Sequence, residues 1–150
     1  MKVLVVYDSL YGNTEEIARA IGGGFTGEVK VLRVGEVDLS ELKTVGLLIV
    51  GSPTQGGRAS PGMRDFLNKI PGSSLEGINV AAFDTRVPTK IVKVFGYAAG
   101  RIAGNLEGKG GTLVVPPEGF FVKSTKGPLK VGELERAAGW ARGIAGSRPT

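Results

Sequence analysis

Short apolar runs recur along this chain of 150 residues, and helical periods separate most of them. The five runs, rich in Val, Ile and Leu, are KVLVVY (2–7), EVKVLRV (28–34), VGLLIVG (45–51), INVAAFD (78–84) and GTLVV (111–115). Continuously apolar strands are typical of a parallel sheet that is covered on both faces. Only EVKVLRV alternates apolar and polar side chains, which predicts an edge strand. We therefore expect an α/β fold, a doubly wound five-stranded parallel sheet, in a single domain spanning residues 1–150.

The clearest helix is predicted over SPGMRDFLNKIPG (60–72). Ser60 suits the N-cap and Pro61 the first turn, and Pro71-Gly72 ends the helical period. Three more helices are expected: one after Thr14, one from about residue 89 to 106, and one from near Val131. The expected apolar faces of the four helices, in chain order, are Ile17, Ala18, Ile21 and Phe25; Met63, Phe66, Leu67 and Ile70; Ile91, Phe95, Ala98 and Ile102; and Leu134, Ala137, Ala141 and Ile144.

Glycine is abundant: it makes up 25 of the 150 residues, more than twice the usual share of about 7%. Such a chain has many tight turns, or places where the backbone approaches another group closely. Gly96, Gly100 and Gly104 recur at every fourth residue of the helix predicted over 89–106. We expect this row to let the helix pack closely on the sheet or on a neighbouring helix. A contact between two copies of the chain is the alternative.

The chain contains no Cys and no His. This excludes disulfides, thiol chemistry, haem or zinc ligation through these residues, and the Ser-His-Asp and Cys-His nucleophile systems. Basic residues outnumber acidic ones, 19 to 14, and are scattered singly, which favours an anionic ligand or an acidic protein over nucleic acid. The first ten residues do not form a signal peptide, and no apolar run is long enough to span a membrane, so a cytoplasmic location is expected.

Three polar loops are expected to share one edge of the sheet, because ligands of open α/β sheets bind beyond the carboxyl ends of the strands. These loops are SLYGNT (9–14), GSPTQGGRASPG (51–62) and DTRVPT (84–89). The first leads into a helix N-terminus, where free N–H groups and the helix dipole favour an anion. It lacks a P-loop Lys and a GxGxxG pattern, which disfavours nucleoside triphosphates and dinucleotides. A simple helix cap, with Asn13 and Glu16 as a capping pair, is the alternative.

The loop Ser9-Leu10-Tyr11-Gly12-Asn13-Thr14 resembles the phosphate-binding loop of the flavodoxins, [ST]-x-[ST]-G-x-T, and departs from it at Tyr11. GSPTQGGRASPGMRDFL (51–67) resembles the loop after the third strand, most closely in the FMN-dependent quinone reductase branch. The resemblance covers essentially the whole chain and implies strand order 2-1-3-4-5 and an FMN cofactor. The residues that it implies for the FMN phosphate are Ser9, Leu10, Tyr11, Gly12, Asn13 and Thr14. Those that it implies for the two sides of the flavin ring are Pro53, Thr54, Gln55, Gly56 and Gly57, and Asp84, Thr85, Arg86 and Val87.

The sequence also departs from the family around the flavin ring. Gln55 stands where Trp is common, and no aromatic residue lies between Phe83 and Phe95. Both departures argue against a very low reduction potential. Arg86 either approaches the N1 side of the ring and stabilises the reduced flavin anion, or faces water. With Arg58 it would give the cofactor mouth a positive rim.

The leading functional interpretation is an FMN-binding electron carrier, monomeric or weakly dimeric, whose redox partner proteins have acidic docking surfaces. The alternatives are an FMN-dependent oxidoreductase of quinone or protoporphyrinogen type, and a flavodoxin-like module without FMN. Phe120 and Phe121 either shape a substrate wall of such an enzyme or belong to the core of an extended fifth strand.

Overall fold

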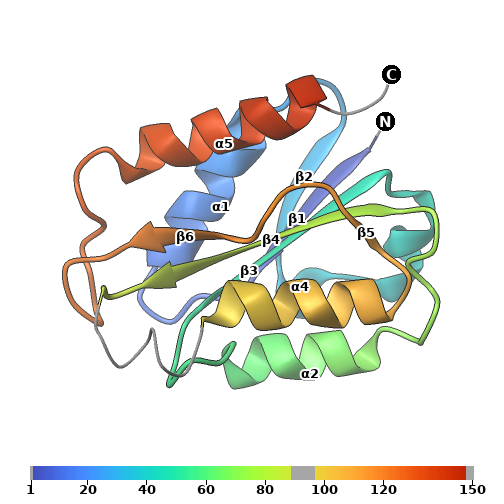
Figure 1. The fold of residues 1–150 in the computed structure, drawn as a ribbon, viewed down its shortest axis with the longest axis horizontal. Coiled ribbons are helices and arrows are strands. Elements are labelled where there is room, and N and C mark those ends of the chain that lie inside the picture. Colours follow the sequence, from blue (N-terminus) through green and yellow to red (C-terminus); the bar gives the residue numbers. More distant parts are fainter. Residues whose placement is uncertain (1, 89–96, 148–150) are drawn as a thin grey trace.

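A computed structural model describes residues 2–88 and 97–147 of the chain. Its centre is a parallel sheet with strand order β2-β1-β3-β4-β5, and a further strand, β6, pairs with β4 (Figure 1). The strands are β1 (Val3–Tyr7), β2 (Val29–Arg33), β3 (Leu47–Pro53), β4 (Asn79–Arg86), β5 (Thr112–Leu113) and β6 (Glu118–Phe121). The predicted α/β fold and strand order are confirmed. The alternating run forms β2 at one edge of the sheet, as predicted.

The fifth position of the sheet differs from the expected single strand. It consists of β5, which pairs with the start of β4, and β6, which pairs with its end. Pro116 and Pro117 lie between them. Because proline has no N–H to donate, these two residues cannot continue the hydrogen-bonded ladder. The chain leaves the sheet there and returns to it three residues further along β4, from Val80 to Phe83.

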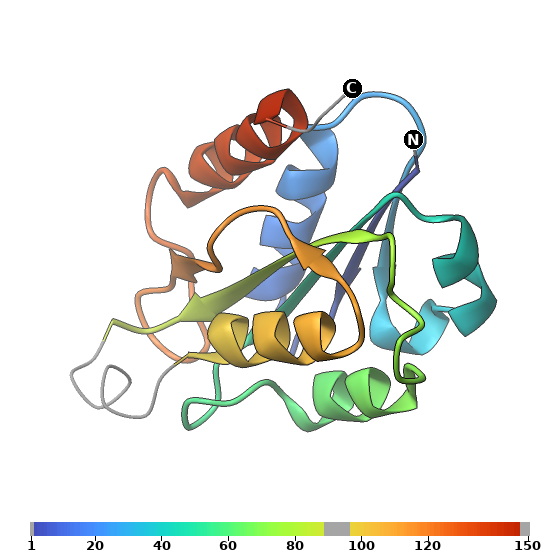
Figure 2. The same ribbon diagram turned by 45° about the vertical axis from the view of Figure 1, so that its right-hand side comes forward.

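Helices cover both faces of the sheet (Figure 2). α1 (Asn13–Gly23) and α5 (Glu133–Ser147) pack together on one face. α2 (Pro61–Lys69) and α4 (Ala98–Gly108) lie side by side on the other. Between β2 and β3 the chain forms two short 3₁₀ helices, η1 (Val34–Glu36) and η2 (Leu39–Thr44). The apolar strands are therefore buried on both faces, as their sequences indicate.

The predicted start of α2 is confirmed in detail. The Ser60 hydroxyl accepts a hydrogen bond from the Met63 N–H at 3.3 Å, and Pro61 is the first helical residue. The expected apolar face of this helix is buried. In α1, by contrast, the predicted alternative that Asn13 and Glu16 form a capping pair is wrong. Gly12 is the N-cap residue, and no side chain caps the helix.

Two expectations about the other helices are also wrong. Leu134 is exposed, because the buried face of α5 consists of Glu133, Ala137, Ala141 and Ile144, and Leu134 lies beside this face. Gly100 and Gly104 are exposed, and a Cβ atom at either would meet nothing within 4 Å, so close packing does not explain them. Gly96, Ile91, Phe95 and the expected helix start near residue 89 lie outside the described residues.

Phe120 belongs to the core. It is fully buried, and its ring makes edge-to-face contacts with Phe83 of β4 and Trp140 of α5, at centroid distances of 6.2 and 6.0 Å. Gly51 of β3 leaves room for this cluster, since a Cβ atom there would lie 2.0 Å from the Phe83 ring. The core interpretation of Phe120 is therefore confirmed, and it forms no wall of a substrate site.

Candidate functional site

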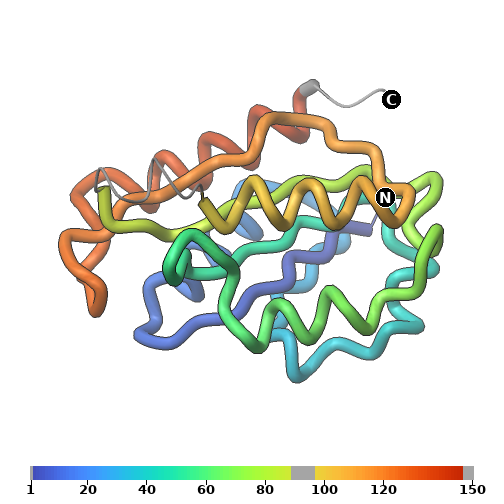
Figure 3. Tube along the Cα trace, turned by 60° about the horizontal axis from the view of Figure 1, so that its bottom comes forward, coloured from blue at the N-terminus to red at the C-terminus, as the bar shows by residue number. Residues whose placement is uncertain are grey.

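The carboxyl ends of β1, β3, β4 and β6 gather at one end of the molecule (Figure 3). The described residues that follow them enclose a hollow of about 210 Å³ that is open to solvent. The residues that line it are Ser9, Leu10, Tyr11, Asn13, Thr14, Pro53, Thr54, Gln55, Gly56, Thr85, Arg86, Val87, Val122 and Thr125.

The first loop presents hydrogen-bond donors to this pocket. Gly12 has a φ of 91°, a left-handed conformation that favours glycine. Its N–H donates to the Ser9 hydroxyl at 3.0 Å. The N–H groups of Asn13 and Thr14, at the start of α1, donate to no group among the described residues. Among the described residues, no Asp or Glu lines the pocket. This arrangement suits an anion.

Hydrogen bonds hold the end of β1 and the loop after β3 together. The Ser60 hydroxyl donates to Asp8 Oδ2 at 2.5 Å, and the Ser60 N–H donates to the Ser52 hydroxyl at 2.9 Å. Asp8 also accepts from the N–H of Ser9 through Oδ1. Sequence reasoning identified Ser60 only as a helix cap. Its second partner, Asp8, lies 52 positions earlier, so no local signal revealed it.

The glycine pair of the loop after β3 forms a tight hairpin. Gln55 and Arg58 exchange backbone hydrogen bonds of 2.8 and 3.0 Å, and Gly56 and Gly57 have φ values of 57° and 80°. Positive φ at both central positions defines a type I′ turn, which explains why both are glycine. Arg101 of α4 donates from Nε to the Gly57 carbonyl at 2.8 Å and thereby attaches the turn to that helix.

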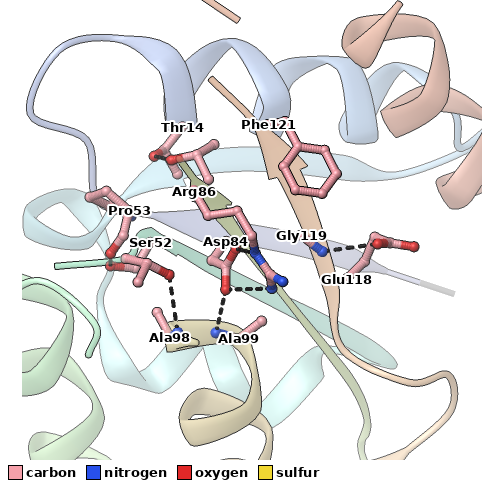
Figure 4. Close-up of polar contacts among 12 residues, drawn as sticks. Thr14, Ser52, Pro53, Asp84, Arg86, Ala98, Ala99, Glu118, Gly119 and Phe121 are labelled. Atoms are coloured by element: carbon pink, nitrogen blue, oxygen red, sulfur yellow. Dashed lines mark hydrogen bonds and ion pairs between the residues drawn. The ribbon is translucent and has the colours of Figure 1, made fainter. Parts of the chain in front are cut away.

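The end of β4 is bound to the start of α4 (Figure 4). The Asp84 carboxylate is fully buried and accepts from Arg86 Nε at 2.7 Å, from Arg86 Nη2 at 2.9 Å and from the Ala99 N–H at 2.9 Å. The Thr54 hydroxyl accepts from the Ala98 N–H at 3.1 Å. Two loops therefore satisfy the first N–H groups of α4.

The side chain of Arg86 is mostly buried, and its charge is paired with Asp84. Its side chain is 15% exposed, and its guanidinium stacks on the Tyr97 ring with 3.3 Å between Cζ and the ring centroid. Gly119 of β6 leaves room for it, since a Cβ atom there would lie 2.2 Å from the guanidinium carbon. The side chain still lines the pocket. The water-facing interpretation is wrong, and the charge of Arg86 is compensated by Asp84.

The other predicted site residues are placed as follows. All of them line the pocket except Gly12, Gly57 and Asp84. The Thr14 and Thr85 hydroxyls share a buried hydrogen bond of 2.8 Å, which joins the first loop to the end of β4. Arg58 lies on the far side of the hairpin and lines a different hollow, so it does not form a rim of this pocket with Arg86.

Sequence reasoning missed the loop between β6 and α5. It contributes Val122 and Thr125 to the pocket. Gly127, with a φ of 102°, lies against Asn13, because a Cβ atom there would be 2.6 Å from the amide oxygen. The only sequence signal was the unusual length of the segment after the fifth apolar run.

No group of three or more Asp or Glu residues could hold a metal ion within 2–88 and 97–147. No helix in these two ranges is long and apolar enough to cross a membrane.

Comparisons with known proteins point to one family. A family model described as Flavodoxin matches residues 5–139. The chain is 32% identical over 91 residues to a flavodoxin of Aquifex aeolicus, covering 56% of this chain and 49% of that protein. It is 31% identical over 101 residues to an NAD(P)H dehydrogenase (quinone) of Chromohalobacter salexigens, covering 51% and 50%. The chain thus spans about half the length of these relatives.

A solved structure agrees over nearly the whole chain. It is described as a flavodoxin from the domain Archaea, has a TM-score of 0.82 and 29% identity, and the match covers 97% of both chains.

Proposed function

The chain belongs to the flavodoxin family, and from this premise we propose that it binds FMN in the pocket at the end of the sheet and carries electrons between redox proteins. The family implies a flavin cofactor. The identity of that flavin as FMN, and electron transfer as the role of the chain, belong to this proposal. A cytoplasmic location, a single domain over residues 1–150 and a monomeric or weakly dimeric state stay predictions.

The observation that carries the proposal is the donor set of the first loop. The N–H groups of Asn13 and Thr14 point from a helix start that no side chain caps, and the nearby Ser9, Asn13 and Thr14 side chains are about nine-tenths or more buried. A phosphate group needs several such donors and no neighbouring carboxylate. Because no acidic residue of the described part of the chain lines the pocket, the residues fit the phosphate of FMN.

The remaining walls fit the flavin ring. Pro53, Thr54, Gln55 and Gly56 come from the β3 loop, and Thr85, Arg86 and Val87 from the end of β4. When bound, FMN supplies the electron-transfer chemistry, and the chain holds it and shields its ring from water. The chain has no His or Cys to move protons at neutral pH, which favours a carrier over an enzyme.

A second candidate is an FMN-dependent quinone reductase. The relative from Chromohalobacter salexigens, described as an NAD(P)H dehydrogenase (quinone), is the observation that favours it. The burial of Phe120 removes one residue that sequence analysis offered as a substrate wall.

Cofactor binding is tested first by the visible spectrum of the purified protein and by titration of the flavin-free form with FMN. Thr14→Val removes a hydroxyl inside the pocket, and Thr112→Val, on an exposed position of β5, is the matched control. A hydrogen bond to a charged group contributes roughly 1.5–3 kcal/mol, so Thr14→Val should weaken FMN binding about tenfold or more. No FMN binding at micromolar concentration would overturn the proposal.

A second assay separates carrier from enzyme. The FMN-loaded protein is incubated with NADPH and a soluble quinone, and the oxidation of NADPH is followed. A carrier should show no turnover without a reductase protein. Saturable NADPH oxidation by the chain alone would favour the quinone reductase.

A further inference from the structure

Arg33 is the last residue of β2 and lies directly opposite Tyr7, the last residue of β1, in the parallel pair of these two strands. Its guanidinium lies over the Tyr7 ring, with 5.4 Å between Cζ and the ring centroid. Because both strands end here, the side chain of Arg33 reaches the residues that follow β1. An arginine of the edge strand therefore lies next to the loop of residues 9–14, which forms the anion side of the candidate pocket.

The Arg33 guanidinium contacts both ends of this loop. Nη1 donates to the Ser9 carbonyl at 3.0 Å, and Nη2 donates at 3.3 Å to Oε1 of Glu15, in the first turn of α1. Nη1 also lies 3.8 Å from Asp8 Oδ1, the oxygen that accepts from the Ser9 N–H. A planar guanidinium can make these contacts at once, whereas a lysine ammonium is a single point of charge. Arg33 therefore joins the start of the loop to the helix turn that follows it.

The same contacts compensate two negative charges beside the anion side of the pocket. Asp8 immediately precedes the loop, and Glu15 immediately follows it. Their side chains are 15% and 31% exposed, so water screens these charges only in part. Without a positive charge between them, both carboxylates would repel an anion at the N–H groups of Asn13 and Thr14. Arg33 supplies that positive charge.

We propose that Arg33 is a positioning residue for the phosphate side of the pocket: it holds the loop of residues 9–14 in its binding conformation and compensates Asp8 and Glu15. Naming the phosphate as that of FMN rests on the proposed function, whereas the binding of an anion by the loop does not. Arg33 is not among the residues that line the pocket, so it acts through the loop. A loop that is fixed beforehand loses less conformational freedom when its ligand binds, which raises the affinity.

The test compares FMN with riboflavin, which has the same ring system and no phosphate. The dissociation constants of both are measured for the flavin-free wild type and for Arg33→Gln by the quenching of flavin fluorescence. The side chain of Arg33 is 41% exposed, so the variant should fold, and urea unfolding checks this. Arg19→Gln is the matched control, because Arg19 pairs with the other oxygen of Glu15 at 2.9 Å from an exposed position on α1. Arg33→Lys and Glu15→Gln/Arg33→Gln complete the set.

Arg33→Gln should weaken FMN binding about fivefold or more, because a charge-assisted hydrogen bond and two ion pairs are lost. It should weaken riboflavin binding less than about twofold, and Arg19→Gln should change FMN binding less than about twofold. Arg33→Lys, which keeps the charge without the fork, should lie between the wild type and Arg33→Gln. Glu15→Gln/Arg33→Gln should regain part of the FMN affinity, because one uncompensated carboxylate is gone.

A purely structural role would weaken FMN and riboflavin binding alike, and that result would overturn the inference. Equal effects of Arg33→Gln and Arg19→Gln on FMN binding would overturn it as well. No recovery in the double variant would overturn the compensation of the carboxylates.

Failure of this inference is distinguishable from failure of the proposed function. If the wild type binds FMN and Arg33→Gln binds it equally well, only the role of Arg33 is overturned. If the wild type binds no FMN, the proposed function is overturned, and inorganic phosphate decides the role of Arg33 through the backbone amide signals of residues 9–14 in ¹H–¹⁵N NMR spectra. Phosphate binding that Arg33→Gln weakens about threefold or more would support the role. Equal phosphate binding by both proteins, or none by the wild type, would overturn it.

Discussion

The ion pair of Asp84 and Arg86 links β4 to α4 at the edge of the candidate site, and its removal offers the sharpest test of the structure. In Asp84→Asn the side chain keeps its shape but loses its charge and one acceptor oxygen. The guanidinium of Arg86 then remains packed on Tyr97, with 15% of its side chain exposed and no carboxylate partner. The Ala99 N–H loses its charged acceptor as well.

The expected loss follows from the burial of this pair. Removing one partner of a buried ion pair costs roughly 3–5 kcal/mol. Because the guanidinium keeps some contact with solvent, we take the lower end, about 3 kcal/mol. For a chain of this length, each kcal/mol lowers the Tm by about 2–4 °C, so Asp84→Asn should lower it by about 6–12 °C.

The assay is urea and thermal unfolding of the flavin-free protein, with Asp65→Asn, an exposed acid on α2, as the control. The control should change the free energy of unfolding by less than about 0.5 kcal/mol. Arg86→Gln and the double variant complete a cycle, in which we expect a coupling energy of about 1 kcal/mol or more. A loss below about 1 kcal/mol in Asp84→Asn, together with no coupling, would refute the reasoning.

Three further substitutions test the loops and the C-terminal helix. Gly12→Ala should destabilise the fold by about 1–2 kcal/mol and weaken FMN binding, because Gly12 has a φ of 91°; unchanged unfolding and affinity would contradict this. Ser60→Ala should cost about 1–2 kcal/mol in urea unfolding, since the hydroxyl both caps α2 and donates to Asp8; a neutral result would show that water replaces it. Hydrogen bonds from Arg136 and the Phe121 N–H lower the pKa of Glu133 below its usual 4.5. Its carboxylate therefore stabilises the fold above that pH and loses this effect on acidification. Glu133→Gln should lower the free energy of unfolding at pH 7, and the free energies of the variant and the wild type should converge at acidic pH. A pH-independent difference between them would refute the assignment.

The order of elements was readable from the sequence because it depends on short-range patterns. Continuous apolar runs indicated strands buried on both faces, the one alternating run indicated the edge strand, and Ser60-Pro61 indicated the start of α2. The three polar loops were also correctly assigned to one edge of the sheet, since parallel strands end at the same edge and the loops after β1, β3 and β4 all line the pocket.

Tertiary contacts decided what the charged and hydroxyl side chains do. The sequence contains Asp84 and Arg86 two positions apart, but only the packing of α4 and of Gly119 shows that they pair and that Arg86 is enclosed. The sequence likewise contains Arg58, Arg64 and Arg101 over 44 positions, without any sign that they share a hollow. Local patterns set the backbone conformation and the buried face of each element, because both depend on residues a few positions apart. Ion pairs and pockets depend on where distant segments meet, and that is determined only when the whole chain has packed.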